Sequence, residues 1–594
     1  MTAQSTGFCN LVRLLGLFSP RRRWQSLAVL TLTLVGAVAE LVSIGAVLPF
    51  LQLIAAPQTL GQLPFVGPFL ASYLDRPADL LVPAALLLAG AAVASALIRV
   101  VLIWATSRYV AGLTHDLAMT VFGRVIRQPY SVFIRRNSAE VLSGIEKVGI
   151  VGTYLLNPLL TALSSVLIAC GIIGLLFTVN PVVAVLAGGT MAVLYGVIAL
   201  ITRPMLLSGG KRLAATSTAR VKLTQESLGG IRDIILDRSH HVFEWQFRVV
   251  DADGRRASAQ QNTVSLAPRY LVEGIGIVLI AAMAIFYQGQ PGGVVAAIPI
   301  LGMLALGAQR LLPLVQNVNS AWVNYAATVG YIADLFVLVD APVLGSQDGQ
   351  KIAPFHNAIE LCAVGFRYAP DIVALRSINL RIARGQRVGL MGTTGSGKST
   401  LIDIVMGLLD PGEGQLVVDG RPIDETNVAS WQAQVAHVPQ TIFLMDTSIA
   451  ANIAFGTPSE NIDIARVHAS ADKAGVSDFI SSLPDGYNTL VGERGVQLSG
   501  GQRQRIGIAR ALYKRASVLV LDEATSALDD ATEAAVMEAV KQLDANLTVL
   551  IIAHRLSTLA SCDVVYRLEQ GRVVDQGSYA DVLARRNDTG HSKA

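Results

Sequence analysis

The stretch Gly392-Thr393-Thr394-Gly395-Ser396-Gly397-Lys398-Ser399-Thr400 decides how the second half of this chain folds. It fits the pattern G-x-x-x-x-G-K-[ST] of a phosphate-binding loop. Its glycines let the backbone bend so that successive amide groups point inward and surround an anion. A helix that begins near Lys398 directs its positive end at the same point. We therefore expect Lys398 to reach the outer phosphates of a nucleotide and the Ser399 hydroxyl to ligate Mg²⁺.

The composition separates this nucleotide-binding half from an apolar first half. The chain has 594 residues, of which 52% are hydrophobic and 15% are charged, whereas soluble domains carry about 25% charged residues. Most of the apolar runs lie between residues 25 and 320. The net charge of +4 is small and gives no indication of a nucleic-acid partner. The four cysteines have no metal-ligand spacing, and they are Cys9, Cys170, Cys362 and Cys562.

Windows of about 20 apolar residues predict six membrane spans in the first half. These spans cover roughly 25–56, 80–112, 151–179, 181–202, 268–288 and 293–318. The basic segment 1–24 and the Lys- and Arg-rich segment 203–269 predict that these segments and both termini are cytoplasmic. Arg21–Arg23 also suit a twin-arginine export signal, but the apolar run that follows is longer than a signal core.

Two polar stretches, 113–150 and 203–267, are too long for tight turns between spans. Both are predicted to be helices that leave the membrane and return. Their expected tips are Ser131–Ser143 and Gly229–Ser239. Such projections need something to contact, and the nucleotide-binding half is the candidate.

The sequence thus predicts a membrane domain of six transmembrane helices followed by a cytoplasmic α/β domain, because strands and helices alternate after the linker. Gln386–Met391 is the predicted strand before the phosphate loop. The expected boundaries are an interfacial elbow helix at 1–24, the membrane domain at 25–330, a linker at 331–356, the nucleotide-binding domain at 357–586 and a disordered tail at 587–594.

Two further motifs in the second half suit nucleotide chemistry. Ser517–Leu521 is a predicted buried strand that ends in Asp522 and Glu523. Asp522 is placed to bind Mg²⁺, and Glu523 is the candidate general base for an attacking water, although acids also favour helix starts for structural reasons. Leu498-Ser499-Gly500-Gly501-Gln502 precedes a basic helix, and its small residues and free helix N-terminus predict a second anion site.

Leu498–Gln502 (LSGGQ) resembles the signature motif of ABC transporters, and this resemblance covers essentially the whole chain. It implies ATP and Mg²⁺ as ligands. It also implies roles for five further elements. Gln440 would sense Mg²⁺ and the attacking water, His554 would contact the γ-phosphate, and Tyr368 would stack on adenine. Ser526–Asp529 would lie at the interface between the two nucleotide domains of a dimer. Gly492–Gly495 would contact the coupling helices, which are the cytoplasmic tips of the membrane domain.

The same resemblance implies two nucleotide domains in a head-to-tail sandwich. Each ATP then lies between the phosphate loop Gly392–Thr400 of one chain and the Ser499–Gln502 segment of another. Because all motifs are intact, a homodimer with two competent sites is the economical interpretation, and a heterodimer remains an alternative. Six spans with long cytoplasmic extensions resemble the exporter class.

Charged residues inside the predicted spans are the clues to what is carried. They are Glu40, Arg99, Arg269, Glu273 and Arg310. Structural pairing, such as Glu40 with Arg99 or Glu273 with Arg269, is one interpretation. Three arginines against two acids leave a surplus of positive charge, however. Guanidinium groups suit phosphate or pyrophosphate, so Arg99, Arg269, Arg310 and Glu40 are candidate contacts to an anionic headgroup.

Glu40 with Leu48–Leu51, and the segments Ala267–Gly276 and Gln309–Pro313, are similar to bacterial lipid-linked oligosaccharide flippases. That family has a short amphipathic helix between its first two spans, for which Leu60–Leu74 is the candidate despite its prolines. The implied function is ATP-driven flipping of a polyprenyl-pyrophosphate glycan across the bacterial inner membrane. A general lipid or multidrug exporter is the alternative within transport. A gated channel or a regulatory ATPase with the same fold is an alternative from a different functional class. The six predicted spans exclude a soluble ABC enzyme.

Overall fold

A computed structural model of the chain describes most of its residues as two units. The described residues are 13, 14, 16, 18–46, 50, 53, 77–179, 181–288, 293–344, 352–522, 546–552 and 556–590. One unit is Met1–Gln128 with Arg135–Pro342, and the other is Pro129–Ile134 with Val343–Ala594. The second unit therefore includes a short segment from within the first half of the sequence.

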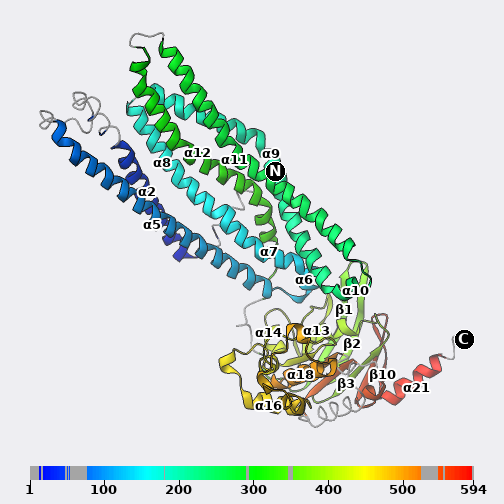
Figure 1. Cartoon of the computed structure of the whole chain (residues 1–594). Coiled ribbons are helices and arrows are strands. Elements are labelled where there is room, and N and C mark those ends of the chain that lie inside the picture. The colour runs from blue at the N-terminus through cyan, green and yellow to red at the C-terminus, as the bar shows by residue number, and fades with distance from the viewer. Residues whose placement is uncertain are drawn as a thin grey trace. The chain divides into compact units, whose positions relative to one another are not determined.

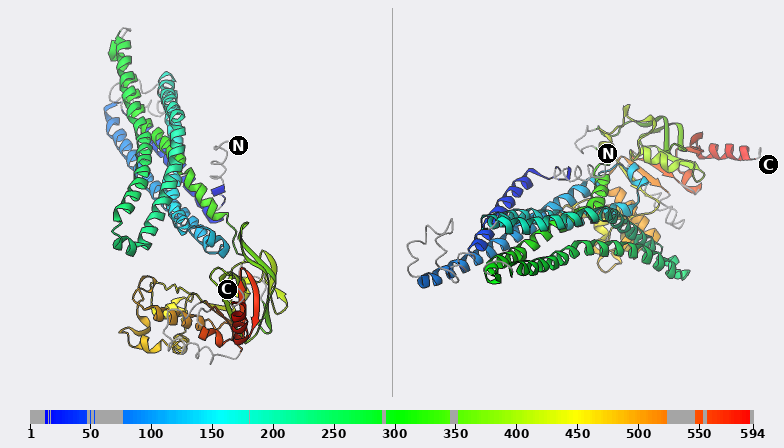
Figure 2. Two further views of the ribbon diagram at one scale, coloured as in Figure 1. Left: turned by 90° about the vertical axis from the view of Figure 1, so that its right-hand side faces the viewer. Right: turned by 90° about the horizontal axis from the view of Figure 1, so that it is seen from above.

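The first unit is built from long helices that run side by side (Figures 1 and 2). The helices are α2 (Pro20–Gly45), α5 (Pro77–Ile126), α8 (Asn157–Val179), α9 (Pro181–Gly229), α11 (His240–Gln288) and α12 (Gly293–Val339). Four of the predicted spans lie within one of these helices, 151–179 also takes in the end of α7 (Ser138–Val151) and the following π-helix, and the described part of 25–56 lies mainly on α2. Four of the helices listed have 47 to 50 residues, more than twice the ~20 that cross a membrane. They therefore continue well beyond a bilayer, as the polar stretches predicted.

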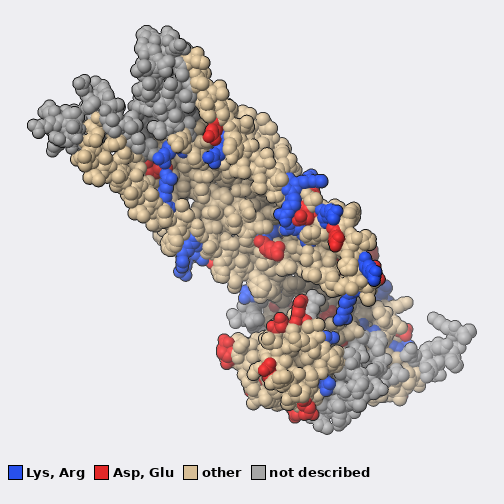
Figure 3. All heavy atoms as spheres, in the orientation of Figure 1, with Lys and Arg blue, Asp and Glu red and all other residues tan. Residues whose placement is uncertain are grey.

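Within the described part of the chain, five helical stretches are long and apolar enough to cross a membrane. They are Pro20–Ser43, Leu81–Ile126, Ser138–Gly174, Gly188–Gly229 and Gln309–Val339. The predicted span 268–288 lies on α11, outside these five. On the face shown in Figure 3, most of the helical surface is neither basic nor acidic, and charged atoms gather in a few separate places.

Short elements connect the long helices at the two predicted tips. Between α5 and α8 lie α6 (Tyr130–Arg135), α7 (Ser138–Val151) and the π-helix η3 (Gly152–Leu156). Between α9 and α11 lies α10 (Ile231–Leu236). Asn137 caps α7 because its side-chain oxygen accepts a hydrogen bond from the amide of Ala139.

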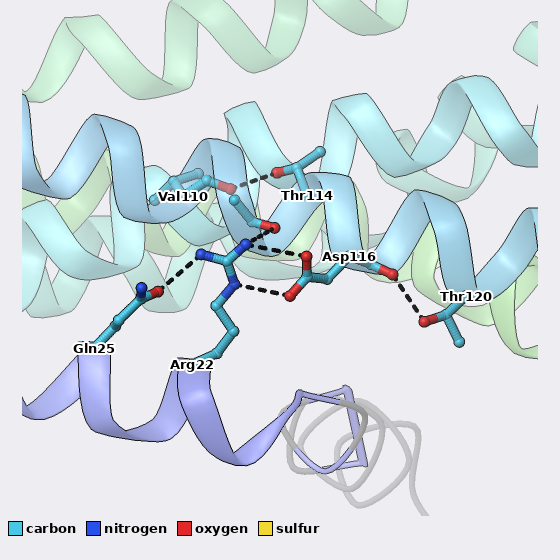
Figure 4. A network of polar contacts seen from close by, with 7 residues as sticks. Arg22, Gln25, Val110, Thr114, Asp116 and Thr120 are labelled. Carbon is cyan, nitrogen blue, oxygen red and sulfur yellow. Dashed lines mark hydrogen bonds and ion pairs between the residues drawn. The ribbon is translucent and has the colours of Figure 1, made fainter.

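A polar clamp fixes the start of α2 against α5 (Figure 4). The Arg22 guanidinium donates to both carboxylate oxygens of Asp116, at 2.8 and 3.1 Å, and to the side chain of Gln25 at 2.8 Å. It also donates to the carbonyl of Gly112 at 3.2 Å, and a Cβ on that glycine would come within 2.4 Å of the guanidinium. Arg22, part of the basic segment expected before the first span, therefore belongs to the first turn of α2.

The described strands of the second unit form two sheets. The antiparallel sheet has the order β2-β1-β4-β5 and contains β1 (Ala358–Ala369), β2 (Ile372–Ala383), β4 (Glu413–Val418) and β5 (Arg421–Pro422). The larger sheet has the order β10-β9-β3-β8-β7-β6, in which only β10 runs antiparallel to its neighbour. Its strands are β3 (Arg387–Gly392), β6 (Val435–Val438), β7 (Val518–Asp522), β8 (Thr548–Ile552), β9 (Val564–Glu569) and β10 (Arg572–Gly577).

The strands β3, β7 and β8 read as apolar runs because both of their faces are covered. Val388, Leu390, Val518 and Val520 are all fully buried. The predicted strands Gln386–Met391 and Ser517–Leu521 are confirmed as β3 and β7. The sequence prediction missed the β9–β10 hairpin, which closes the edge of the sheet next to β3.

Three expected boundaries differ from the structure. Helix α12 continues through 331–339, where we expected linker, because Ile332, Leu335 and Phe336 extend its buried apolar face. The last helix, α21 (Tyr579–Gly590), includes 587–590 of the expected tail and ends at a glycine, the residue that commonly stops helices. Helix α2 begins at Pro20 and so includes the end of the expected elbow segment 1–24.

Candidate functional site

The phosphate loop lies where β3 ends and α13 (Lys398–Val405) begins. Gly395 and Gly397 have φ angles of 80° and 102°, a left-handed backbone conformation that other residues adopt only with strain. A Cβ on Gly392 would lie 2.4 Å from the carbonyl oxygen of Leu568. The motif's glycines are therefore required by the turn itself, which confirms the predicted strand–loop–helix arrangement.

The polar groups of this loop suit a bound phosphate. Lys398 is only 7% exposed, and its ammonium donates to the carbonyls of Gly392 and Thr393 at 2.9 and 3.0 Å. The Ser396 hydroxyl is buried and has no hydrogen-bond partner among the described residues. No side chain caps the amide groups at the start of α13. These donors converge on the loop, and Ser399 has an exposed side chain.

Two carboxylates lie near each other beside the loop. Asp522 is the last residue of β7, and Asp403 lies one turn into α13. Burial, with a smaller contribution from the negative charge of Asp522, raises the pKa of Asp403 from 3.8 to about 6. The sequence analysis did not single out Asp403, because a lone acid inside a helix carries no motif. Asp403 is influenced by the charge of Asp522, which is the expected Mg²⁺ ligand.

Tyr368 lies near the end of β1 and forms a hydrogen bond with Thr400 on α13, the helix that follows the phosphate loop. Its hydroxyl lies 3.0 Å from the Thr400 hydroxyl, and its ring packs edge-on against Phe366 with centroids 5.0 Å apart. The expected role of Tyr368, stacking on adenine, needs an aromatic side chain held beside the phosphate loop. The hydrogen bond to Thr400 holds it there.

The signature segment forms the N-terminus of α18 (Gly500–Tyr513). Ser499 accepts a hydrogen bond from the Gln502 amide at 3.2 Å, and the Gln502 side chain accepts one from the Ser499 amide at 2.8 Å. This reciprocal pair is a capping box. Ser499 is exposed, and Gly500 and Gly501 leave the helix end uncovered by side chains. Gln440 is exposed two residues after β6.

Several expected site residues lie outside the described part of the chain. They are Glu523, His554 and Ser526–Asp529. The candidate helix Leu60–Leu74 lies outside it as well. The strands that precede Glu523 and His554 belong to the described part of the chain. β7 ends at Asp522, directly before Glu523, and β8 ends at Ile552, two residues before His554.

Charged residues on α2, α5 and α12, three helices that contain candidate membrane spans, interact with one another. Glu40 on α2 is 5% exposed and forms an ion pair with Arg99 on α5. Arg310 on α12 interacts electrostatically with Arg99. This cluster contains one acid and two arginines, so it keeps a net positive charge. The pairing of Glu40 with Arg99, one of the two interpretations of the sequence, is therefore present in the structure.

Arg269 and Glu273, both on α11, do not form an ion pair with each other in the described part of the structure. Arg269 is exposed and interacts electrostatically with Tyr195 on α9. Tyr195 is 7% exposed, and its hydroxyl has no hydrogen-bond partner among the described residues. The structure thus gives the predicted pair Glu273–Arg269 no support.

Comparison with known proteins identifies the family. A family model for the ABC transporter transmembrane region matches residues 45–286, and a model for the ABC transporter itself matches residues 375–526. An ATP-dependent lipid A-core flippase from Cupriavidus metallidurans is 32% identical over 489 residues, which are 80% of each chain. The chain belongs to the ABC transporter family. It therefore couples ATP hydrolysis to transport across a membrane.

Other similar proteins agree with this assignment. An ATP-dependent lipid A-core flippase from Alkalilimnicola ehrlichii is 31% identical over 79% of this chain and 80% of its own. The heterocyst differentiation ATP-binding protein HepA from Nostoc is 40% identical over 47% of this chain and 46% of its own. A solved structure of a bacterial Atm1-family ABC exporter with ATP bound is 25% identical and superposes with a TM-score of 0.78. The superposition covers 96% of this chain and 98% of that exporter. This ABC transporter thus has the exporter fold.

Proposed function

We propose that this ABC transporter is an ATP-driven flippase for an anionic glycolipid, in particular a polyprenyl-pyrophosphate-linked oligosaccharide. It would act in the bacterial inner membrane with its nucleotide domain and both termini in the cytoplasm. The observation that carries the proposal is the net positive cluster of Glu40, Arg99 and Arg310 on three membrane helices. Relatives named as flippases of a lipid A-core support a lipid as the substrate.

The charge balance of this cluster favours an anion. An isolated ion at the bilayer centre costs about 3 kcal/mol on insertion scales, so each needs a partner or water. Glu40 compensates one of the two arginines, and the second adds a like charge beside the first. A phosphate or pyrophosphate group would compensate that charge and accept the paired hydrogen bonds that a guanidinium offers. A site for lipophilic cations would carry the opposite charge.

On the nucleotide side, the loop's amide groups and Lys398 would hold the phosphates of ATP. The Ser399 hydroxyl, Gln440 and Asp522 offer oxygen ligands of the kind that Mg²⁺ prefers. A bound Mg²⁺ would neutralise charge on the outer phosphates. Glu523 would take the proton of the attacking water, and His554 would donate to the outer phosphate.

A homodimer would complete each nucleotide site, because the phosphate loop and the Ser499 segment of one chain are two separate anion-binding ends. The exposed apolar side chains of α10, namely Ile231, Ile235 and Leu236, are a surface that a second copy can cover. A mixed dimer tests this arrangement. One chain carries Lys398→Ala and the other carries Ser499→Ala.

In a head-to-tail dimer both defects of this mixed pair fall in one site, and the other site is intact. We therefore expect about half of the wild-type ATP hydrolysis. If each site were formed by one chain alone, both sites would be defective and hydrolysis would be lost. Pairs in which both chains carry the same substitution are the controls, and both should be inactive.

The alternative function is general lipid export, which the relatives' names also favour. Substrate-stimulated ATP hydrolysis in proteoliposomes separates the two. We expect a polyprenyl-pyrophosphate glycan to stimulate more strongly than an uncharged glycolipid of the same tail. Equal stimulation by both would favour general lipid export, and stimulation by hydrophobic cations alone would contradict the proposal.

A further inference from the structure

The second unit contains a cavity of about 410 Å³ that lies apart from the phosphate loop. Its lining includes Ser517 and Leu547, which directly precede β7 and β8. Strands β3, β8 and β7 run parallel, so this cavity lies at their amino ends. The phosphate loop follows the carboxyl end of β3. The cavity and the phosphate loop therefore lie at opposite ends of the parallel strands of this sheet.

Four basic side chains from different elements line this cavity. Arg384 lies in the turn between β2 and β3, Arg466 and Lys473 lie on α16 (Ile464–Lys473), and Arg515 follows α18. The described lining residues include no acid. None of the four forms an ion pair with a described residue, whereas Arg381 and Arg585, elsewhere in this unit, pair with Glu360 and Asp575.

The most buried of the four cations is held in a fixed position. The Arg466 Nε and Nη2 atoms donate to the carbonyl of Tyr513, at 2.8 and 2.5 Å, and the guanidinium lies 4.1 Å from the centre of the Tyr513 ring. These contacts leave Nη1 without a hydrogen bond to a described residue. A guanidinium held in this way loses little side-chain entropy when it binds an anion.

Helix dipoles explain only part of this arrangement. Lys473 ends α16 and Arg515 follows the end of α18, where cations are favourable. Arg466, however, lies in the first turn of α16, where a cation is unfavourable, and Arg384 lies on no helix. Four like charges around one cavity repel one another, and a bound anion would relieve that repulsion.

We propose that this cavity binds a small soluble phosphorylated molecule with at least two negative charges. Guanidinium groups favour phosphate oxygens, and Ser470 and Ser517 in the lining offer hydroxyl donors. A volume of about 410 Å³ exceeds that of a single phosphate and suits a compact organic molecule. This site is independent of the transported substrate.

Calorimetric titration of the full-length protein tests the proposal. The protein is kept with Mg²⁺ and saturating AMP-PNP, a non-hydrolysable ATP analogue, so that the phosphate loops are filled. Fructose 1,6-bisphosphate is the probe, and fructose 6-phosphate is the singly phosphorylated comparison. We expect saturable binding of the bisphosphate at one site per chain, about tenfold tighter than the monophosphate, and weaker at high salt.

The variants Lys473→Gln and Arg515→Gln should each weaken bisphosphate binding by about tenfold. Arg381→Gln, which removes the same charge from a paired arginine on β2, should change it less than twofold. Unfolding temperature and ATP hydrolysis close to those of the wild type would show that the variants are folded. Absence of saturable binding, equal affinity for the two sugar phosphates, or equal loss in Arg381→Gln would overturn the proposal.

Discussion

The phosphate loop and the cluster of Glu40, Arg99 and Arg310 both contain basic side chains, yet they are assembled in different ways. The loop consists of nine consecutive residues, and the φ angles of Gly395 and Gly397 set its shape. The cluster combines Glu40, Arg99 and Arg310 from three helices, and only helix packing brings them together. The expected nucleotide contacts are therefore encoded locally in this chain, while the proposed substrate contacts depend on tertiary structure.

The largest expected effect is at the nucleotide site. Glu523→Gln keeps the shape of the side chain but removes the proposed general base, so ATP hydrolysis should fall by at least about 100-fold, and translocation should fall with it. Hydrolysis and lipid translocation in proteoliposomes measure both. Glu460→Gln, an exposed acid on a short 3₁₀ turn, should have no effect. If the Glu523→Gln variant translocated lipid normally, transport would not depend on ATP hydrolysis and the proposal would be contradicted.

A smaller and more selective effect is expected in the membrane. Arg310→Ala should lower translocation of the anionic lipid by about tenfold, because the substrate phosphate loses one charge-assisted hydrogen-bond partner. Basal ATP hydrolysis should stay within about twofold, since local motifs set it. Arg310→Lys, which keeps the charge, should retain part of the translocation. If Arg310→Ala flips lipid normally, Arg310 has a structural role only.

The ion pair between Glu40 and Arg99 should matter for stability. Arg99→Ala leaves a buried carboxylate without its partner, so we expect a loss of about 3 kcal/mol. Glu40→Gln should cost less, because the Arg99 side chain is 44% exposed whereas the Glu40 carboxylate is buried. The double variant Glu40→Gln/Arg99→Gln should be more stable than Arg99→Ala. Thermal unfolding in lipid nanodiscs measures all three, and equal stability of the single variants would contradict this asymmetry.

The smallest expected effect concerns Asp403. Its raised pKa, about 6, means that the folded protein holds this proton more tightly than the unfolded chain. The contribution of Asp403 to stability should therefore fall as pH rises from about 4 to 6 and stay low above that range. Asp403→Asn should raise the unfolding temperature of the nucleotide-free protein at pH 7.5 by about 2 °C and have less effect at pH 4.5.

The exposed residue Asp410, close in sequence to Asp403, provides the control for this prediction. Asp410→Asn should leave the unfolding temperature unchanged at both pH values, because water already solvates that carboxylate. A stabilisation by Asp403→Asn that is equal at pH 7.5 and pH 4.5 would show that packing, not charge, is responsible.

The sequence predicted those features that depend on short segments. Glycine spacing identified the phosphate loop, and apolar runs located β3 and β7. At Ser499–Gln502 the sequence predicted an anion site but not the capping box that the structure contains there. In each of these cases, neighbouring residues determine the backbone conformation.

Other features of the structure were missed or left open by the sequence. The β9–β10 hairpin was overlooked although Val564, Tyr566 and Leu568 alternate before the turn at Gly571, whose φ is 77°. Asp403 gave no signal because its raised pKa depends on burial and on Asp522. The sequence offered both Glu40–Arg99 and Glu273–Arg269 as ion pairs. The structure contains the first, which forms where α2 packs against α5, and the described residues do not form the second.

Translocation of a fluorescent polyprenyl-pyrophosphate glycan in proteoliposomes tests the central claim most directly. The wild-type protein is compared with Mg²⁺ and ATP and with Mg²⁺ and AMP-PNP. We predict movement across the bilayer with ATP alone, and a matched uncharged glycolipid should move far more slowly. Equal movement with AMP-PNP, or equal rates for the charged and uncharged lipids, would contradict an ATP-driven flippase for an anionic glycolipid.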